Sequence, residues 1–333
     1  MRRRSLLLAA VPAGLVTLAG CGDDKSDSSK SASPSPSASS SPPPKIVDGP
    51  LPAITAGTKF GEKPTIAKGS GEPSKNLTVK TVIAGSGRTV AENDFIRADY
   101  LGQIWDTGKV FDNSFDRKRP LVMQLAQGSI IDGWRYALQG KKTGSRIEIA
   151  VPPALGYGTG GNEQAGIRGT DTLVFVIDLI ESFNSKSSAK GTPVPQTDAA
   201  LPKVGTNTDG QVPKVTVPKT DPPKKLVSEY VLEGDGAELK ADQTVLCQFQ
   251  GLVWDSGKTF QRTYGSGRLS QFSLEQMQQA VKGLAQGLTG KKVGSRVLIV
   301  VPPELGYGDN PPSGGAVKKG DTLVFTVDIL AAM

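Results

Sequence analysis

Apolar and polar positions alternate with a period of two over several short stretches in the first half of the chain, as is typical of half-buried β-strands. These stretches span residues 77–83, 95–101, 146–151 and 172–179. One segment has the period of a helix, with its apolar positions on one face and Gly140 able to end it: Ile130, Ile131, Trp134 and Leu138. The pattern predicts an α+β fold, in which a strongly twisted antiparallel sheet packs around one short helix.

The same pattern occurs twice along the chain. Residues 105–111 (WDTGKVF) return as 254–260 (WDSGKTF), and 140–146 (GKKTGSR) return as 290–296 (GKKVGSR). The offset is 149 or 150 residues, which is the length of a whole domain and far longer than a solenoid repeat. We therefore predict two tandem domains of one fold, the second with its helix running through Met277, Val281, Leu284 and Leu288.

The repeat extends upstream of the strands into stretches rich in Pro, Gly, Lys and Thr. Residues 51–54 (LPAI) match 201–204 (LPKV), and Pro64 and Pro213 keep the offset of 149. We predict domains over 46–183 and 201–333, joined by a linker over 184–200. Each domain would begin with an extended leader that covers apolar sheet surface with three side chains: Leu51, Ile54 and Ile66 in the first, Leu201, Val204 and Val215 in the second.

The start of the chain has the pattern of an export signal. Arg2, Arg3 and Arg4 precede an apolar run over 6–19 that is too short to span a bilayer as a helix. The run ends in Leu18-Ala19-Gly20-Cys21, which resembles a bacterial lipobox; the alternative is an ordinary signal peptide with an incidental cysteine. We predict a signal peptide over 1–20, a lipid on Cys21 and a Ser/Pro-rich disordered tether over 21–45, which would place the protein on the extracytoplasmic side of the cell membrane.

Composition excludes several classes of function. The formal net charge is +7, loss of the signal would lower it to about +4, and no basic block supports nucleic-acid binding. The chain has no histidine, which removes histidine-dependent catalysis and histidine-ligated metals. We expect neither metal nor cofactor, and we expect Cys247, within an apolar run, to be a buried structural thiol.

Five motifs of the first domain are similar to those of the FKBP family of peptidyl-prolyl cis–trans isomerases. They are Tyr100-x-Gly102, residues 108–114 (GKVFDNS), residues 130–134 (IIDGW), residues 155–158 (LGYG) and residues 172–175 (TLVF). The resemblance covers 77–181 and 226–330. It implies a five- to six-stranded antiparallel sheet curled around a helix, with an apolar pocket between them and a tryptophan at its floor.

The resemblance also implies the site residues. The catalytic set is Tyr100, Phe111, Asp112, Ile130, Ile131, Trp134, Tyr157 and Phe175; Leu121, where the family has an aromatic, and Ile167, in the flap beside the pocket, would contact substrate. The second domain has lost part of this set: Phe249 replaces the tyrosine, Gln261 the aspartate, Leu284 the tryptophan, Val281 an isoleucine, and Ser270 stands at the position of Leu121. We therefore expect catalysis in the first domain.

Such a site needs no proton transfer. Rotation about an X–Pro bond has a barrier of about 18–20 kcal/mol, because twisting the bond destroys amide resonance. A twisted amide is less polar at its carbonyl, so an apolar site favours it over the planar ground state. By resemblance, the Ile131 N–H and the Tyr157 hydroxyl would hold substrate carbonyls, and Asp112 would contact the twisted carbonyl carbon or orient Tyr100.

These observations favour a surface-tethered prolyl isomerase that assists the folding of exported proteins. Its partners would be proline-containing polypeptides and macrolide inhibitors, and it would contact the membrane through its lipid. The alternative is a binding module that holds proline-containing chains or a partner protein without turnover, which the altered second domain suits. A purely structural spacer would explain neither the retained site nor the order of its residues.

Overall fold

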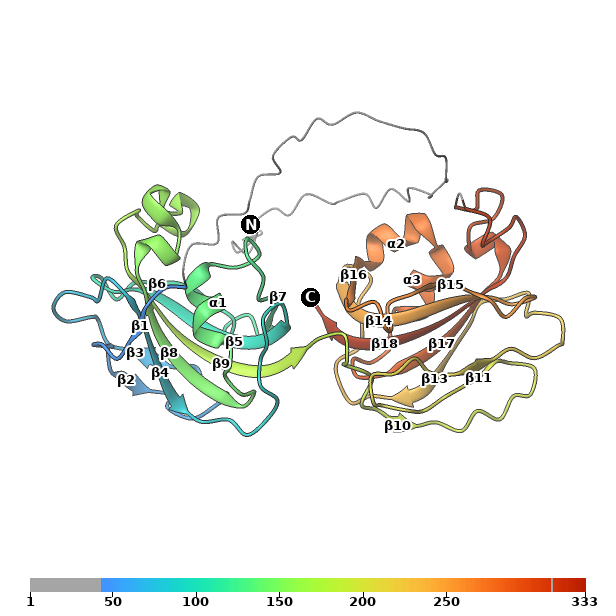
Figure 1. Cartoon of the computed structure of the whole chain (residues 1–333), viewed down its shortest axis with the longest axis horizontal. Helices are drawn as coiled ribbons and strands as arrows, with labels where there is room; N and C mark the ends of the chain where they lie inside the picture. The colour runs from blue at the N-terminus through green and yellow to red at the C-terminus, as the bar shows by residue number, and fades with distance from the viewer. Residues whose placement is uncertain (1–42, 313) are drawn as a thin grey trace, which may run out of the picture. The chain divides into compact units, whose positions relative to one another are not determined.

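The computed structural model describes residues 43–312 and 314–333, and it forms two compact units, the first built mostly from residues up to Ile180 and the second mostly from residues after it (Figure 1). The predicted signal peptide, Cys21 and nearly all of the tether lie outside the described residues. The α-helices of the described chain have seven residues each, and none of them is long enough to cross a membrane.

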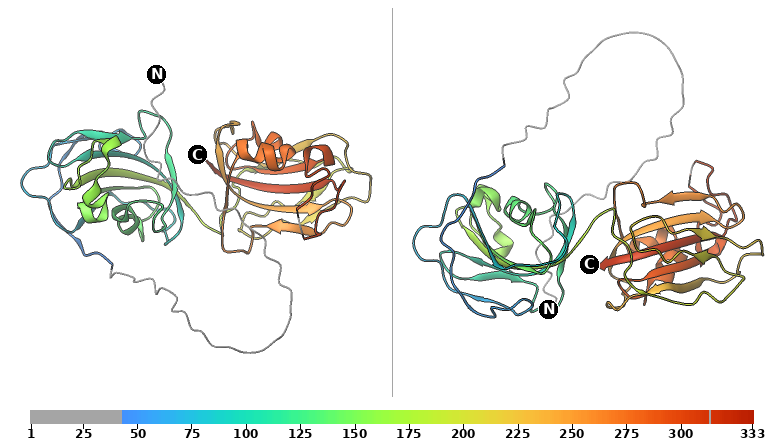
Figure 2. Two further views of the ribbon diagram at one scale, coloured as in Figure 1. Left: turned by 90° about the horizontal axis from the view of Figure 1, so that it is seen from above. Right: turned by 60° about the horizontal axis from the view of Figure 1, so that its bottom comes forward.

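The first unit is built on one seven-stranded sheet in the order β1-β4-β8-β9-β5-β6, with β7 also paired to β5. The strands are β1 (Ile46–Val47), β4 (Leu77–Ile83), β5 (Phe95–Ile104), β6 (Val110–Asn113), β7 (Leu121–Gln124), β8 (Ser145–Val151) and β9 (Leu173–Phe183). The sheet curves around α1 (Asp132–Leu138), and three short 3-10 helices, η1 (Pro153–Leu155), η2 (Gly158–Gly160) and η3 (Glu163–Ala165), follow β8 (Figures 1 and 2). The α+β fold predicted from the sequence is therefore confirmed.

The helix lies very close to the sheet. A Cβ on Gly133 would come within 2.4 Å of the Val151 side chain, so only glycine permits this approach. On the same helix Trp134 and Leu138 are buried, as their spacing predicts, and Ala137 is buried as well. The helix itself begins at Asp132, two residues later than the apolar pattern indicates, which leaves Ile130 and Ile131 in the preceding loop.

The leader covers the opposite face of the sheet. Its strands β2 (Ile54–Ala56) and β3 (Thr65–Ile66) form a small hairpin, and Leu51, Ile54 and Ile66 pack on the outward side chains of the sheet. These outward side chains are Leu101, Trp105, Ala150, Val174 and Val176. Because both faces are covered, every residue of β8 is buried, including the polar ones that alternation would place in solvent.

A buried ion pair fastens the leader to the sheet. The Arg146 guanidinium donates to both carboxylate oxygens of Asp178 (2.6 and 2.7 Å), and both side chains are almost fully excluded from solvent. Arg146 also donates to the leader carbonyls of Gly57 and Glu62, the latter at 2.7 Å, while the Gly61 N–H donates to Asp178 (2.6 Å). Losing either charged partner from such a buried pair costs about 3–5 kcal/mol, so the leader is an integral part of the unit.

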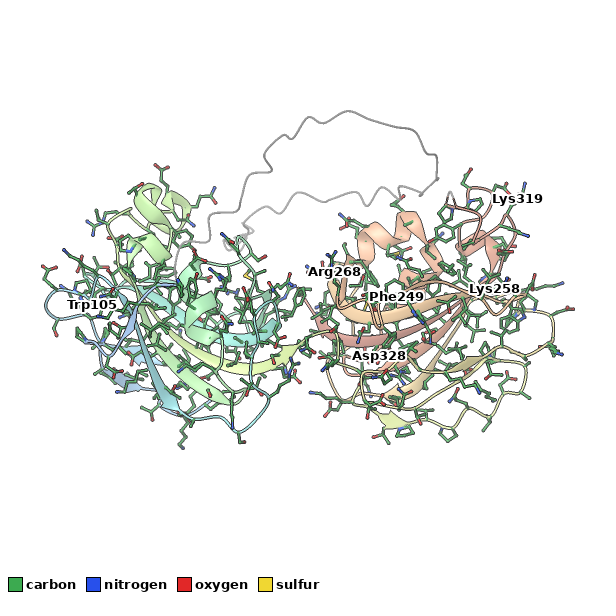
Figure 3. All side chains as sticks on the ribbon, viewed as in Figure 1. Trp105, Phe249, Lys258, Arg268, Lys319 and Asp328 are labelled. Carbon is green, nitrogen blue, oxygen red and sulfur yellow. The ribbon has the colours of Figure 1, made fainter. Side chains whose placement is uncertain are left out.

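The second unit repeats this plan in the order β10-β13-β17-β18-β14-β15, with β16 paired to β14. Its strands are β10 (Thr192–Pro193), β13 (Val227–Glu233), β14 (Thr244–Val253), β15 (Thr259–Arg262), β16 (Ser270–Ser273), β17 (Arg296–Val301) and β18 (Leu323–Ala332), with η4 at Pro303–Leu305. Its leader hairpin, β11 (Lys203–Val204) and β12 (Val215–Thr216), packs on the outer sheet face through Leu201, Val204 and Val215. Arg296 repeats the ion pair with Asp328, which is labelled in Figure 3 (2.6 and 2.7 Å), and it donates to the leader carbonyls of Gly205 and Asn207.

The helix of the second unit differs from the sequence prediction. One helix through Met277 and Leu288 was expected, but the structure has two, α2 (Leu274–Ala280) and α3 (Lys282–Leu288). The break is at Val281, whose backbone angles (φ −142°, ψ 83°) are far from helical values. A β-branched residue at an apolar position keeps the periodicity intact, so the pattern could not reveal the break.

The structure also differs from the expected linker over 184–200, because this segment lies against the second unit. The Ala189 N–H donates to Asp328 (3.0 Å), and the Gln248 side chain donates to the carbonyls of Ser185 and Ser187 (2.9 and 2.7 Å). β10 then adds an edge strand to β13. β1 is the corresponding edge strand of the first unit. Because of these two added strands, each sheet has seven strands where five or six were expected.

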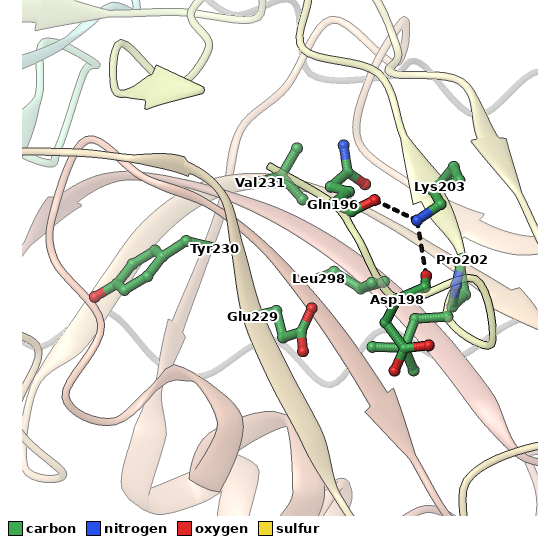
Figure 4. A pocket seen from close by; sticks show the side chains of 9 residues that line it. Gln196, Asp198, Pro202, Lys203, Glu229, Tyr230, Val231 and Leu298 are labelled. Carbon is green, nitrogen blue, oxygen red and sulfur yellow. Dashed lines mark hydrogen bonds between the residues drawn. The ribbon is translucent and has the colours of Figure 1, made fainter. Parts of the chain in front are cut away.

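Beyond β10 the chain passes a small cleft beside β13, lined in part by Glu229, Tyr230 and Leu298 (Figure 4). The Lys203 ammonium closes one side of it by donating to the carbonyls of Gln196 and Asp198, the latter at 2.7 Å. The cleft thus lies where the leader and the supposed linker meet the sheet of the second unit.

One buried carboxyl in the first unit makes its stability depend on pH. Glu148 of β8 is 3 % exposed, one of its oxygens has no hydrogen-bond partner, and burial raises its pKa to about 7 against the weaker opposing effect of Lys80. The folded state therefore binds this proton more tightly than the unfolded state does. The resulting penalty is absent below about pH 4.5 and complete above about pH 7.

We expect Glu148→Leu, which installs the residue found 150 positions later at Leu298, to stabilise the protein at pH 8 by on the order of 2 kcal/mol and much less at pH 5. Thermal unfolding at the two pH values measures the difference, with the exposed Glu72→Leu as the control. An equal stabilisation at both pH values would contradict the assignment.

Candidate active site

Four aromatic side chains of the first unit form a continuous row of edge-to-face contacts. Tyr100 of β5 meets Trp134 of α1 with ring centroids 5.3 Å apart, Trp134 meets Phe175 of β9 at 5.4 Å, and Phe175 meets Phe111 of β6 at 5.6 Å, with interplanar angles of 84–86°. Each such contact contributes about 0.5–1.5 kcal/mol beyond its buried area. Phe111 is the ring of this row that stays partly exposed, so the row leads from the core to the surface.

The close approach of the last two rings depends on Gly102 in β5. A Cβ there would lie 2.6 Å from Phe111 and 2.8 Å from Phe175. The tyrosine and glycine of the Tyr100-x-Gly102 motif therefore serve one purpose, since one supplies a ring and the other leaves room for two more.

A polar cluster adjoins the tyrosine end of the row. The Tyr100 hydroxyl donates to one oxygen of Asp112, and the Arg117 guanidinium donates to the other. Arg117 also donates to the Tyr100 oxygen (3.0 Å), with its Cζ 5.9 Å from the centre of the tyrosine ring. Burial raises the pKa of Tyr100, and the neighbouring Asp112 raises it further. The phenol therefore stays protonated and continues to donate its hydrogen bond to the carboxylate.

Sequence reasoning missed Arg117. The available signal was a basic residue five positions after Asp112, at the far side of a turn that begins with Asn113. That turn is rigid: the Asn113 side chain accepts from the Asp116 N–H (2.9 Å), and the Ser114 hydroxyl accepts from the Tyr100 N–H (2.9 Å). The turn returns the chain so that Arg117 faces the carboxylate, which spacing alone could not show.

The remaining predicted residues lie on the elements around the row. Ile130 and Ile131 are partly buried in the loop before α1, and Tyr157 is partly buried between η1 and η2, where burial raises its pKa. Ile167 is 4 % exposed and is held by a pair of backbone hydrogen bonds with Asn162 (2.8 and 2.9 Å). Leu121 begins β7 and is partly buried, on a strand paired with β5.

Comparison with known proteins agrees with this geometry. The sequence profile of a family described as FKBP-type peptidyl-prolyl cis-trans isomerase matches residues 86–180 and 236–330. The chain belongs to this family. It carries two FKBP domains, called domain 1 and domain 2 below.

Similar proteins bear related names. The chain is 37 % identical over 119 residues to an "FK506-binding protein" of Streptomyces anulatus, a match that covers 36 % of this chain and 96 % of that one. It is 30 % identical over 262 residues to human "Peptidyl-prolyl cis-trans isomerase FKBP9", covering 78 % of this chain and 38 % of the relative. Among solved structures, FkpA from Escherichia coli is 35 % identical over 35 % of this chain and 52 % of that one, with a TM-score of 0.30.

Domain 2 keeps the end of the row and loses its polar part. Phe260 and Phe325 repeat the edge-to-face contact with centroids 5.8 Å apart. Phe249, labelled in Figure 3, takes the place of Tyr100 without a hydroxyl, and the exposed Gln261 takes the place of Asp112. Leu284, 4 % exposed, fills the space of the tryptophan. Cys247 is a buried thiol, as expected, and burial raises its pKa.

The polar cluster of domain 1 should act as a unit. We expect Arg117→Leu and Tyr100→Phe each to lower kcat/KM for an X–Pro peptide on the order of 10-fold, since each removes a charge-assisted hydrogen bond that holds Asp112. Because both act through the same carboxylate, the double variant should lose much less than the product of the two losses. The exposed Arg119→Leu, two residues away, is the control, and fully multiplicative losses would show that the two residues act independently.

Proposed function

We propose that this protein is a peptidyl-prolyl cis–trans isomerase at the outer face of the cell membrane, that it assists the folding of exported proteins, and that domain 1 carries the activity. The observation that supports this most is the contrast between the domains. Domain 1 has the complete row of four rings and the Tyr100–Asp112–Arg117 cluster, whereas the described residues of domain 2 retain two of the corresponding rings in contact and no counterpart of the cluster.

The geometry of domain 1 suits catalysis by stabilisation of a twisted amide. Phe111, Phe175 and Trp134 present an apolar surface that favours the less polar twisted bond over the planar one. The neutral Tyr157 hydroxyl can donate to a substrate carbonyl, and so can the Ile131 N–H. Asp112 is fixed beside Phe111 by two donors, so it meets the substrate already oriented. None of these groups has to gain or lose a proton.

Domain 2 in this proposal is a weakened site that binds proline-containing chains. Its rings Phe260 and Phe325 still provide an apolar surface, but Gln261 stands at the position of Asp112. This same observation favours the second candidate function, a module that binds proline-containing chains or a partner protein without turnover. The two candidates differ in whether the full chain accelerates X–Pro isomerisation.

The names of relatives support both the reaction and a class of ligand. Human FKBP9 and E. coli FkpA are named as peptidyl-prolyl isomerases, and the Streptomyces relative is named for binding FK506. We extend both properties to domain 1 and expect macrolides of this type to compete with peptide there. The cellular location rests on the sequence of residues 18–21 and on the Ser/Pro-rich segment that follows.

A matched pair of substitutions tests the assignment of activity to domain 1. Phe175 and Phe325 are equivalent, are 4 % and 2 % exposed, and each contacts one phenylalanine edge to face. In the full chain we expect Phe175→Leu to lower kcat/KM for an X–Pro peptide at least about 10-fold, and Phe325→Leu to leave it within about twofold. Equal losses would contradict the division of roles. A wild-type chain that binds the peptide without accelerating isomerisation would favour the binding module.

The anchor has its own test. In the native host we expect metabolic labelling with a fatty acid to mark the protein and Cys21→Ala to abolish the label and release the protein from the membrane fraction. Labelling that persists in this variant, or a mature N-terminus at another residue, would remove the anchor from the proposal.

A further inference from the structure

The segment that enters the helix differs between the two domains. β7 and β16 begin at Leu121 and Ser270, an offset of 149, whereas α1 and α3 begin at Asp132 and Lys282, an offset of 150. The segment over 274–281 in domain 2 is therefore one residue longer than its counterpart over 125–131. In domain 1 it is a loop, and in domain 2 it contains α2.

The Ile131 N–H is among the backbone donors that the loop of domain 1 leaves without a hydrogen bond within the described residues. The loop turns through a hydrogen bond from the Ser129 N–H to the Ala126 carbonyl (3.1 Å), with Gly128 in the left-handed region (φ 79°). Ile131 follows with φ −58° and ψ 140°, and its carbonyl accepts from the Trp134 N–H (3.1 Å). Within the described part of the chain the Ile131 N–H donates no hydrogen bond of normal geometry. Ile131 lies three residues before Trp134, the tryptophan of the ring row.

The corresponding donor of domain 2 is occupied. Ser273 starts α2 by accepting from the Gln276 N–H (3.4 Å), and the Val281 N–H ends it by donating to the Met277 carbonyl (2.9 Å). Val281 is 3 % exposed and belongs to the hydrophobic core of the domain. Its N–H cannot donate to a substrate unless the last turn of α2 opens.

We infer that α2 disables domain 2 through the backbone, independently of its altered side chains. This inference rests on the proposed function, in which the Ile131 N–H holds a substrate carbonyl. In domain 2 the extra residue lets the chain close a helical turn, and that turn takes up the equivalent donor. The segment 274–281 is then the determinant that separates a site with turnover from one without, and restoring Tyr, Asp and Trp at their positions is not sufficient.

The test uses the full chain with domain 1 inactivated by D112Q/W134L, which gives it the residues of domain 2. In this background we expect F249Y/Q261D/L284W to add no X–Pro isomerase activity. Replacing residues 274–281 by the domain 1 loop LAQGSII in addition should raise kcat/KM on the order of 10-fold or more, the effect of regaining one hydrogen bond to substrate. A gain of the same size from the three side chains alone would overturn the inference.

A reciprocal exchange guards against failure of the combined variant to fold. Placing LEQMQQAV over residues 125–131 of the otherwise wild-type chain should reduce kcat/KM to the level of the D112Q/W134L chain while the melting temperature shows a folded protein. A folded exchange variant with wild-type activity would overturn the inference.

Amide hydrogen exchange in the wild-type chain gives a readout without any variant, because the Val281 amide should be protected and the Ile131 amide should exchange rapidly; equal rates would overturn the inference. Failure of the proposed function is distinguishable, since it would appear as a wild-type chain whose isomerase activity is absent or does not fall with D112Q/W134L.

Discussion

The buried pair of an arginine and an aspartate is the interaction on which each domain depends. Arg146 and Asp178 sit on neighbouring strands of the sheet, and their remaining hydrogen-bonding groups are turned toward the leader. Neither side chain could be buried alone, because each would carry an uncompensated charge into the core. The leader supplies the backbone carbonyls and N–H that complete the pair, and the pair in turn holds a Pro- and Gly-rich segment that has little tendency to fold by itself.

This arrangement turns a two-layer domain into a three-layer one. The helix covers one face of the sheet and the leader the other, so the central strands are enclosed like those of a much larger protein. In domain 1 the buried aspartate, Asp178, accepts a hydrogen bond from the Gly61 N–H of the leader. In domain 2 the equivalent Asp328 accepts from the Ala189 N–H, which belongs to the segment before the leader. Both domains therefore provide a backbone N–H donor to the aspartate, but they take it from different segments of the chain.

Much of the fold follows from the sequence because it depends on periodicity. The strand predicted over 77–83 is β4 residue for residue, and the six leader side chains expected from the repeat do cover the sheet, with Val217 in addition. Periodicity did not reveal the helix break at Val281, because this apolar residue leaves the pattern of the helix unchanged. It also did not reveal that the polar segment around Ala189 packs on the second unit, because hydrogen bonds hold that segment in place. In the candidate site the rings that the motifs point to do lie in contact, whereas Arg117 reaches Asp112 only through the geometry of a turn.

The placement of the tryptophans has a consequence for how the protein can be observed. The chain has three, and each reports on a different part of the molecule. Trp105 and Trp254 lie beneath the two leaders, where their indole N–H groups donate to the carbonyls of Gly71 (3.1 Å) and Thr220 (3.0 Å), while Trp134 lies in the ring row of domain 1. Intrinsic fluorescence of single-tryptophan variants can therefore separate release of either leader from a change at the ring row of domain 1, without an added label.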